Sequence, residues 1–129
     1  MSLNQGLEAY KQTESSYVEG IDSAHGRIKL VFDIIISNLE NVEEKHPRTE
    51  FTSFGKCMNG LRILGSSLDM EKGGEIAAQL VELYDYCIRG LREYLSEKDI
   101  EKIQEIHQII SKLSEGWEQS DPDKLEQQR

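Results

Sequence analysis

The residues whose chemistry could support catalysis or metal binding are three histidines, two cysteines and the carboxylates. A di-iron centre in a helical bundle needs paired Glu-x-x-His motifs on facing helices, together with further carboxylates. Only Glu43 and His46 have this spacing, and Pro47 follows them directly. Cys57 and Cys87 lack the Cys-x-x-Cys spacing of structural zinc sites, and no nucleophile with an activating base is legible. The sequence therefore predicts no enzyme and no metal or nucleotide cofactor.

The histidines and cysteines are better explained as structural residues. His25, His46 and His107 are isolated from one another, and His107 falls at the edge of an apolar helical face. A histidine in that position is expected to be satisfied by a hydrogen bond. Cys57 and Cys87 each fall on the apolar face of a predicted helix. This favours buried, reduced thiols over a disulfide or a reactive thiol.

Length and charge exclude several classes of partner. A chain of 129 residues fits one domain. Its formal net charge of −9 argues against nucleic acid, because the phosphates would be repelled. No apolar run approaches the roughly 20 residues that a membrane span needs, and no charged-then-apolar leader opens the chain. We expect no membrane insertion and a cytoplasmic location.

A double glycine, Gly73–Gly74, precedes the most regular apolar pattern in the chain. Glycine is disfavoured inside helices, so the pair predicts a break. Apolar residues then recur at spacings of three and four, which predicts one face of a helix over 74–95. This face contains Ile76, Leu80, Leu83, Tyr84, Cys87 and Leu91, flanked by Ala77, Val81, Ile88 and Leu95. So broad a stripe indicates a helix that touches two neighbours, or a neighbour and a partner.

Three further helices are predicted over 23–44, 49–67 and about 99–118, the last capped by Asp99. The expected core of the first is Ile28, Val31, Phe32, Ile35, Leu39 and Val42. That of the second is Phe54, Met58, Leu61 and Leu68, flanked by Phe51, Cys57 and Leu64. That of the last is Ile103, Ile106, Ile110, Leu113 and Trp117. The fold class is therefore all-α, an antiparallel four-helix bundle over 23–119, with a flexible arm over 1–22 and a disordered tail over 120–129.

Two features of the predicted helices lack a role in the core. Leu30 and Ile34 point nearly opposite to the core stripe of the first helix, so they are either scattered exposed residues or part of a partner-binding groove. Among the glycines of the second helix, Gly65 falls on the apolar side and could permit close helix approach. Gly55 and Gly60 lie elsewhere, so that argument does not extend to them.

The chain resembles the flagellin-specific export chaperone (FliS) family. The central resemblance is the order Leu68–Asp69, Gly73–Gly74 and Leu83–Tyr84–Asp85–Tyr86. It extends to Ala9–Tyr10–Lys11–Gln12, Ser23–Ala24–His25, Leu30–Val31–Phe32–Asp33 and Trp117. Ala24 stands where the family commonly has proline, and Ile34 where a glycine often follows the acidic residue. These departures leave the fold prediction intact, but they bear on how the client is contacted.

The resemblance implies a cytoplasmic chaperone that binds the disordered C-terminal segment of flagellin. Such a protein prevents premature polymerisation and delivers its client to the flagellar type III export apparatus. The N-terminal arm, by the same resemblance, covers part of the bundle and moves when the client binds. Candidate partner-binding residues are Tyr10, Leu30, Ile34, Leu61, Leu64, Leu68, Ile76, Leu80 and Tyr84. The alternative is a helical-bundle adaptor or regulatory protein with a different client.

Overall fold

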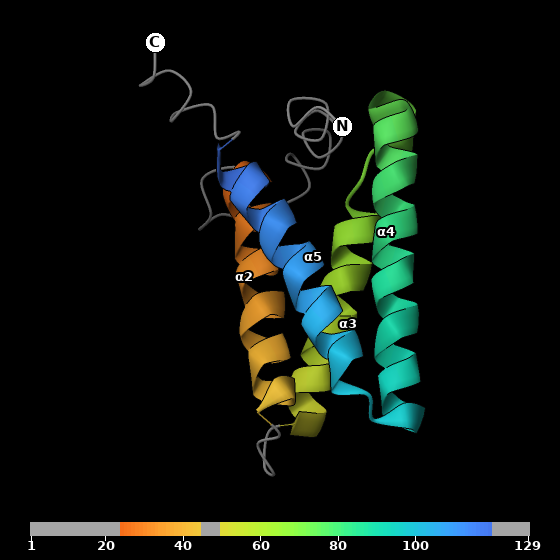
Figure 1. Ribbon diagram of the computed structural model, residues 1–129. Helices are drawn as coiled ribbons and strands as arrows, with labels where there is room; N and C mark the ends of the chain where they lie inside the picture. The colour runs from red at the N-terminus through yellow and green to blue at the C-terminus, as the bar shows by residue number, and fades with distance from the viewer. Residues whose placement is uncertain (1–23, 45–49, 120–129) are drawn as a thin grey trace.

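The computed structural model describes residues 24–44 and 50–119, and these form four helices (Figure 1). The helices are α2 (Ala24–Glu43), α3 (Glu50–Ser66), α4 (Met70–Glu97) and α5 (Ile100–Gln119). No strand occurs in these two ranges. The predicted arm with Tyr10 and the predicted C-terminal tail lie outside the described residues. The all-α prediction is confirmed.

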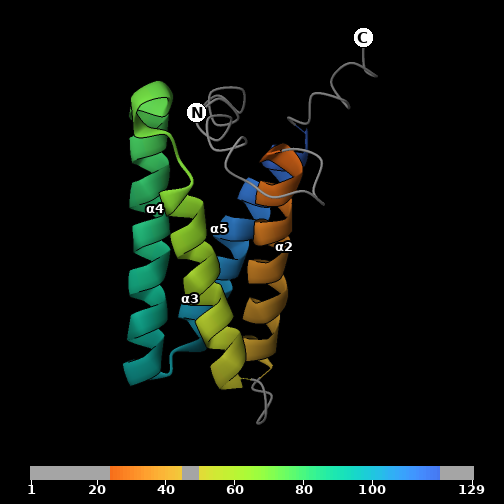
Figure 2. The ribbon, with the colours of Figure 1, turned by 180° about the vertical axis from the view of Figure 1, so that it is seen from behind.

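The helices run alternately down and up, so each is antiparallel to the next in the chain (Figures 1 and 2). α2 packs against α3 and α5, and α4 packs against the same two helices on the other side. Each helix therefore has two neighbours around a central core, which is the up-down-up-down bundle expected from short links. None of the described helices is both long enough and apolar enough to cross a membrane.

The buried stripe of α4 is rotated slightly from the predicted one. Its fully buried positions recur at alternating spacings of three and four: Ala77, Leu80, Tyr84, Cys87, Leu91 and Tyr94. Ile76 and Leu83, predicted in the centre of the face, are only half-buried. Leu95, predicted as a flank, is exposed, and Tyr94 takes the core position in its place. Phe51 at the start of α3 is likewise exposed rather than a flank of the core.

The double glycine interrupts α4 as predicted, although the helix begins before it. Gly74 has φ 53° and ψ −130°, a non-helical backbone conformation that residues other than glycine rarely adopt. A helical turn starting at Met70 precedes this kink. Asp69 caps that turn, since its Oδ1 accepts from the backbone N–H of Lys72 at 2.9 Å. The predicted start at about residue 74 matches the long segment that follows the kink, whereas the short turn before it, capped by Asp69, was not predicted.

Close packing of α2 against α3 depends on Gly60, which corrects the sequence-based expectation. A Cβ built on Gly60 would lie 2.5 Å from Cγ1 of Ile35, a distance that real Cβ atoms do not adopt. At Gly65, expected to allow close approach, the nearest atom would be Cδ2 of Tyr84 at 3.9 Å, an ordinary contact. At Gly55 nothing lies within 4 Å. Gly60 is therefore the residue that sets the α2–α3 spacing.

The link between α4 and α5 is shorter than predicted. α4 continues to Glu97, and Lys98 adopts the left-handed conformation (φ 55°) that ends it. The backbone N–H of Lys98 donates to the carbonyl of Tyr94 at 2.8 Å. Asp99 then caps α5 as predicted, accepting from the N–H of Glu101 at 3.0 Å.

Candidate functional site

Three exposed apolar residues lie on the outer surface of α2 and α3, two helices that pack against each other. Leu30 is 46% exposed, Ile34 is 41% exposed and Ile63 is 38% exposed. Gly60 of α3 lies against Ile35 of α2, which fixes how the two helices face each other. Ile34 is rotated about 100° from Ile35, and Ile63 about 60° from Gly60, so both turn outward beside the contact. We call Leu30, Ile34 and Ile63 the α2–α3 strip.

The seam of α2 with α5 is polar. Lys29 Nζ donates to Oδ1 of Asp33 at 2.8 Å and to Oγ of Ser114 on α5 at 2.9 Å. Further along the seam, His107 Nε2 lies 3.1 Å from Oε1 of Glu40, and Gln104 Nε2 donates to Oε1 of Glu43 at 3.0 Å. These polar side chains of α2 are thus engaged on the α5 side, while on the α3 side Asn41 Nδ2 donates to Oγ of Ser53 at 3.4 Å. The surface left for an apolar partner is on the α3 side.

The structure separates the sequence-predicted site residues into two groups. Leu30 and Ile34 lie together on the surface, one helical turn apart, and their predicted exposure is confirmed. The second group lies in the bundle core and comprises Leu61, Leu64, Leu68, Leu80 and Tyr84. Ile76 is half-buried on α4, and Tyr10 lies outside the described residues. Ile63 was not predicted, because its sequence position does not reveal which helix lies beside it.

The Leu-Tyr-Asp-Tyr motif on α4 divides between the core and the surface. Tyr84 is buried, whereas Tyr86, two residues on, is exposed on the side that faces α5. Asp85 is also exposed, on the outer face of α4 beside Glu82 and Arg89.

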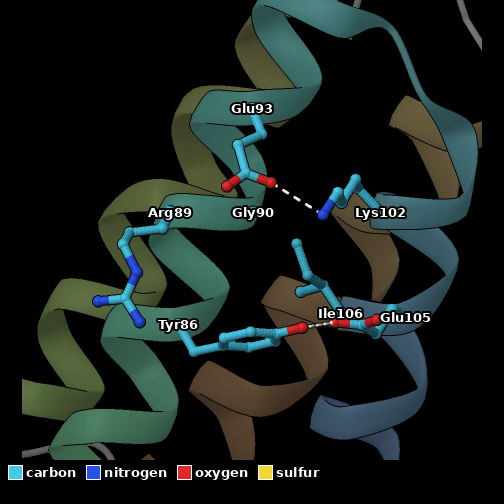
Figure 3. A pocket seen from close by; sticks show the side chains of 7 residues that line it. All are labelled: Tyr86, Arg89, Gly90, Glu93, Lys102, Glu105 and Ile106. Atoms are coloured by element: carbon cyan, nitrogen blue, oxygen red, sulfur yellow. Dashed lines mark hydrogen bonds and ion pairs between the residues drawn. The ribbon is translucent and has the colours of Figure 1, made fainter.

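A small pocket of about 60 Å³ lies between α4 and α5, beside Tyr86 (Figure 3). The Tyr86 hydroxyl donates to Glu105, and Lys102 pairs with Glu93 at 2.8 Å, so each contact joins the two helices. The hydrogen bond to Glu105 raises the pKa of Tyr86, and the bond to Glu93 raises the pKa of Lys102. Tyr86 and Lys102 therefore stay protonated, and each is paired with a carboxylate of the other helix. The arrangement clamps α4 to α5 rather than activating a nucleophile.

The two cysteines are buried and free, as the sequence predicted. Burial raises the pKa of both Cys57 and Cys87 to about 12. Both thiols are therefore neutral at physiological pH and are poor nucleophiles or metal ligands. Within residues 24–44 and 50–119, no three His, Cys, Asp or Glu side chains gather as a metal site.

Comparison with known proteins decides the family. The sequence profile described as "Flagellar protein FliS" matches residues 4–124, nearly the whole chain. The chain belongs to the FliS family. Its known relatives include the flagellar secretion chaperone FliS of Salmonella typhimurium, 33% identical over 95% of this chain and 94% of the relative. Another is the flagellar secretion chaperone FliSB of Pseudomonas aeruginosa, 33% identical over 87% of this chain and 94% of the relative.

More distant FliS relatives have lower identity but cover as much of the chain. The flagellar secretion chaperone FliS of Vibrio cholerae is 23% identical over 94% of this chain and 92% of the relative. No solved structure matches the chain significantly. Membership of the FliS family supports a role in flagellar export and gives no indication of catalysis.

Proposed function

We propose that this FliS-family protein is a cytosolic chaperone for the C-terminal segment of flagellin. It holds that segment in solution, prevents premature polymerisation and brings it to the flagellar export apparatus. The proposal rests on family membership over residues 4–124. The single structural observation that supports it is the α2–α3 strip, an apolar surface in a bundle whose core is already complete.

The chemistry of the client suits such a surface. A flagellin terminus forms amphipathic helices whose apolar faces are buried only in the assembled filament. A helix of this kind binds by laying apolar residues, spaced one turn apart, into a groove between two helices. Leu30 and Ile34 have that spacing on α2, and Ile63 is exposed on α3, the helix that packs against α2. The five buried candidate residues, from Leu61 to Tyr84, would reach a client only if the bundle rearranged.

The identity of the client is tested by co-expression with the host's flagellin, with and without its C-terminal segment. We expect full-length flagellin to co-purify with the protein and the truncated form to be lost. Retention of both forms, or of neither, would contradict the proposal. The latter result would favour the alternative of an adaptor with a different protein client.

The place of binding is tested by the double variant Leu30→Ser with Ile34→Ser. Both side chains are more than one-third exposed, so the free energy of unfolding should stay near that of the wild type. Affinity for a labelled flagellin C-terminal peptide should fall by roughly 1–3 kcal/mol, the transfer free energy of two partly buried aliphatic side chains. Ile63→Ser, on α3, should weaken binding in the same way.

Met70→Ser is the matched control, because Met70 is 50% exposed on a different helix. It should leave affinity unchanged. Thermal midpoints are measured for every variant. If stability falls in step with affinity, the strip belongs to the core. If neither changes in the double variant, the client binds elsewhere, with α3 and α4 as the next candidates.

A further inference from the structure

A furrow runs along α4 on its flank towards α5. One part of it is an open hollow of about 540 Å³ on the outer face of α4, and the other is the pocket of about 60 Å³ between α4 and α5. Tyr86 and Arg89 line both parts, so the two hollows adjoin. The rest of the open hollow is lined by Gln79, Glu82, Leu83 and Asp85. We call the two hollows together the α4 furrow.

An apolar line follows the α4 furrow. Leu83, Tyr86 and Gly90 recur at spacings of three and four residues, so they share one flank of α4. Leu83 is half-buried and Tyr86 is 43% exposed. Ile106 of α5 continues the line, and Figure 3 shows its side chain between the two pairs that join these helices. Apolar residues at this spacing suit contact with one face of a partner helix.

Three charged side chains at the outer edge of the α4 furrow have no partner among the described residues. Glu82, Asp85 and Arg89 are exposed, and none of their side chains forms a hydrogen bond or ion pair with another described residue. The carboxylates on the α5 side of the furrow, Glu93 and Glu105, are by contrast already engaged. Two carboxylates against one guanidinium, on a chain of net charge −9, favour a partner of positive charge.

Contacts between α4 and α5 hold the shape of the α4 furrow. The Tyr86–Glu105 hydrogen bond and the Lys102–Glu93 ion pair each join the two helices. A Cβ built on Gly90 would lie 3.1 Å from Cδ1 of Ile106, so the missing side chain lets α5 approach closely here. A surface whose side chains are already held in place loses less conformational entropy when a partner binds.

The α4 furrow and the α2–α3 strip lie on different faces of the protein. α4 packs against α3 and α5, and both views place it on the opposite side of the bundle from α2 (Figures 1 and 2). The furrow faces the α5 side of α4, whereas the strip lies on α2 and α3. A partner in the furrow therefore leaves the strip accessible.

We propose that the α4 furrow binds a basic amphipathic helix of a second protein partner while the α2–α3 strip holds the client. Apolar residues one turn apart on that helix contact Leu83 and Tyr86. Lysine or arginine residues beside them meet the carboxylates of Glu82 and Asp85. Binding in the furrow does not depend on what the client is, and only its simultaneity with client binding rests on the proposed function.

A synthetic helical peptide of about 18 residues, roughly five turns, is the probe. It carries leucines at spacings of three and four, with lysines on both sides of that line, and a second peptide has glutamates in place of the lysines. In an NMR titration of the full chain, the lysine peptide should give its largest amide shifts in 79–93 and 102–106. The glutamate peptide should bind at least about tenfold more weakly, because like charges then meet at the edge of the furrow.

Matched variants test the carboxylates. Glu82→Gln with Asp85→Asn should raise the dissociation constant of the lysine peptide about fivefold, since two exposed charge contacts are lost. Glu71→Gln with Glu115→Gln is the control, because it changes the net charge equally at two exposed glutamates outside the furrow. It should alter the dissociation constant by less than about twofold.

The apolar line is tested by Leu83→Ser, which should raise the dissociation constant about tenfold through loss of a partly buried leucine contact. Met70→Ser, at an exposed apolar residue of the first turn of α4, should bind like the wild type. Thermal midpoints are measured for all variants. If Leu83→Ser lowers the midpoint, the variants of the exposed Glu82 and Asp85 still decide the matter.

The proposal is overturned if the lysine peptide does not bind at about 1 mM, or if the glutamate peptide binds equally well. It is also overturned if the largest shifts lie outside the furrow, or if the two carboxylate variants lose affinity equally. Saturating flagellin C-terminal peptide should leave the affinity for the lysine peptide unchanged, and competition between the two would overturn simultaneous binding. Failure of the flagellin peptide to bind at all would contradict the proposed client, whereas the furrow would still be judged by the lysine peptide.

Discussion

His25 and Trp117, 92 residues apart in the chain, form a reciprocal pair that joins the start of α2 to the end of α5. Their rings stack with centroids 4.7 Å apart and an angle of 9° between the planes. Trp117 Nε1 donates to the backbone carbonyl of His25 at 2.9 Å, and His25 Nε2 donates to the carbonyl of Trp117. Both side chains are buried. The pair therefore closes this end of the bundle by stacking and by two hydrogen bonds.

This pair predicts graded effects of substitution at Trp117. Trp117→Phe keeps an aromatic ring but removes the donor to the carbonyl of His25, so we expect a loss of about 1–2 kcal/mol in the free energy of unfolding. Trp117→Ala also removes the ring from the core, with an expected loss of about 3–5 kcal/mol. Urea denaturation measures both.

A double-mutant cycle isolates the contribution of the contact itself. His25→Ala combined with Trp117→Ala should lose less than the sum of the two single variants, by about 0.5–1.5 kcal/mol for a stacked pair. Additive losses would show that the two side chains stabilise the bundle independently. The interpretation that their contact closes this end of the bundle would then be wrong.

The glycines of α3 give a second prediction: substitution by alanine should change the free energy of unfolding in opposite directions at Gly60 and Gly55. Gly60→Ala should destabilise the protein by about 1–3 kcal/mol, because the new Cβ meets Cγ1 of Ile35 at 2.5 Å and forces the helices apart. Gly55→Ala is the matched control. It has nothing within 4 Å and should stabilise the helix by about 0.5–1 kcal/mol. Chemical denaturation of the two variants decides this, and a stabilised Gly60→Ala variant would show that Ile35 can move aside.

Gly60 also shows where prediction from sequence stops. The apolar period of α3 shows which face is buried, and Leu61 and Leu64 lie there as expected. It does not show which neighbour lies at each edge of that face, or how closely the neighbour approaches. Gly60 was therefore assigned no packing role, and Ile63 was not recognised beside Ile34. Both assignments depend on the α2–α3 contact, which exists only in the folded bundle.

Prediction of the candidate site met the same limit: the helical pattern shows which residues face away from the core, but not which residues of a neighbouring helix lie beside them. Leu30 and Ile34 were found because two apolar residues opposite a core stripe stand out in any helical pattern. Phe51 and Leu95 were assigned to core flanks. Leu95 lies at the same helical angle as the buried Ala77, whereas Phe51 lies about 80° from the nearest buried residue of α3, Leu61. The structure exposes both at the end of the bundle where α3 starts and α4 ends, and the described helices cover neither side chain fully.

The last prediction concerns the buried thiols and alkaline pH. Burial raises the pKa of Cys57 and Cys87 from the ordinary value of 9.0 to about 12 in the folded state. Between these values the unfolded chain releases thiol protons that the folded chain keeps. The unfolded state then binds fewer protons, so the free energy of unfolding falls as pH rises. By pH 10 the loss should be about 1 kcal/mol for each thiol.

Urea denaturation at pH 8 and pH 10 measures this loss in the wild type and in the double variant Cys57→Ala with Cys87→Ala. At pH 8 the double variant should be less stable than the wild type, because each truncation leaves a small cavity. Its further loss at pH 10 should nevertheless be smaller than that of the wild type by about 2 kcal/mol, since the two titrating thiols are gone. The tyrosines and lysines, including Lys102, are present in both proteins, so their contribution cancels in the comparison. An equal loss in the two proteins would show that the thiols do not carry the effect.

In the wild type at pH 8, a thiol reagent should react with both cysteines only as fast as the bundle opens, because the folded protein holds them neutral and covered. Rapid reaction without denaturant would contradict their burial.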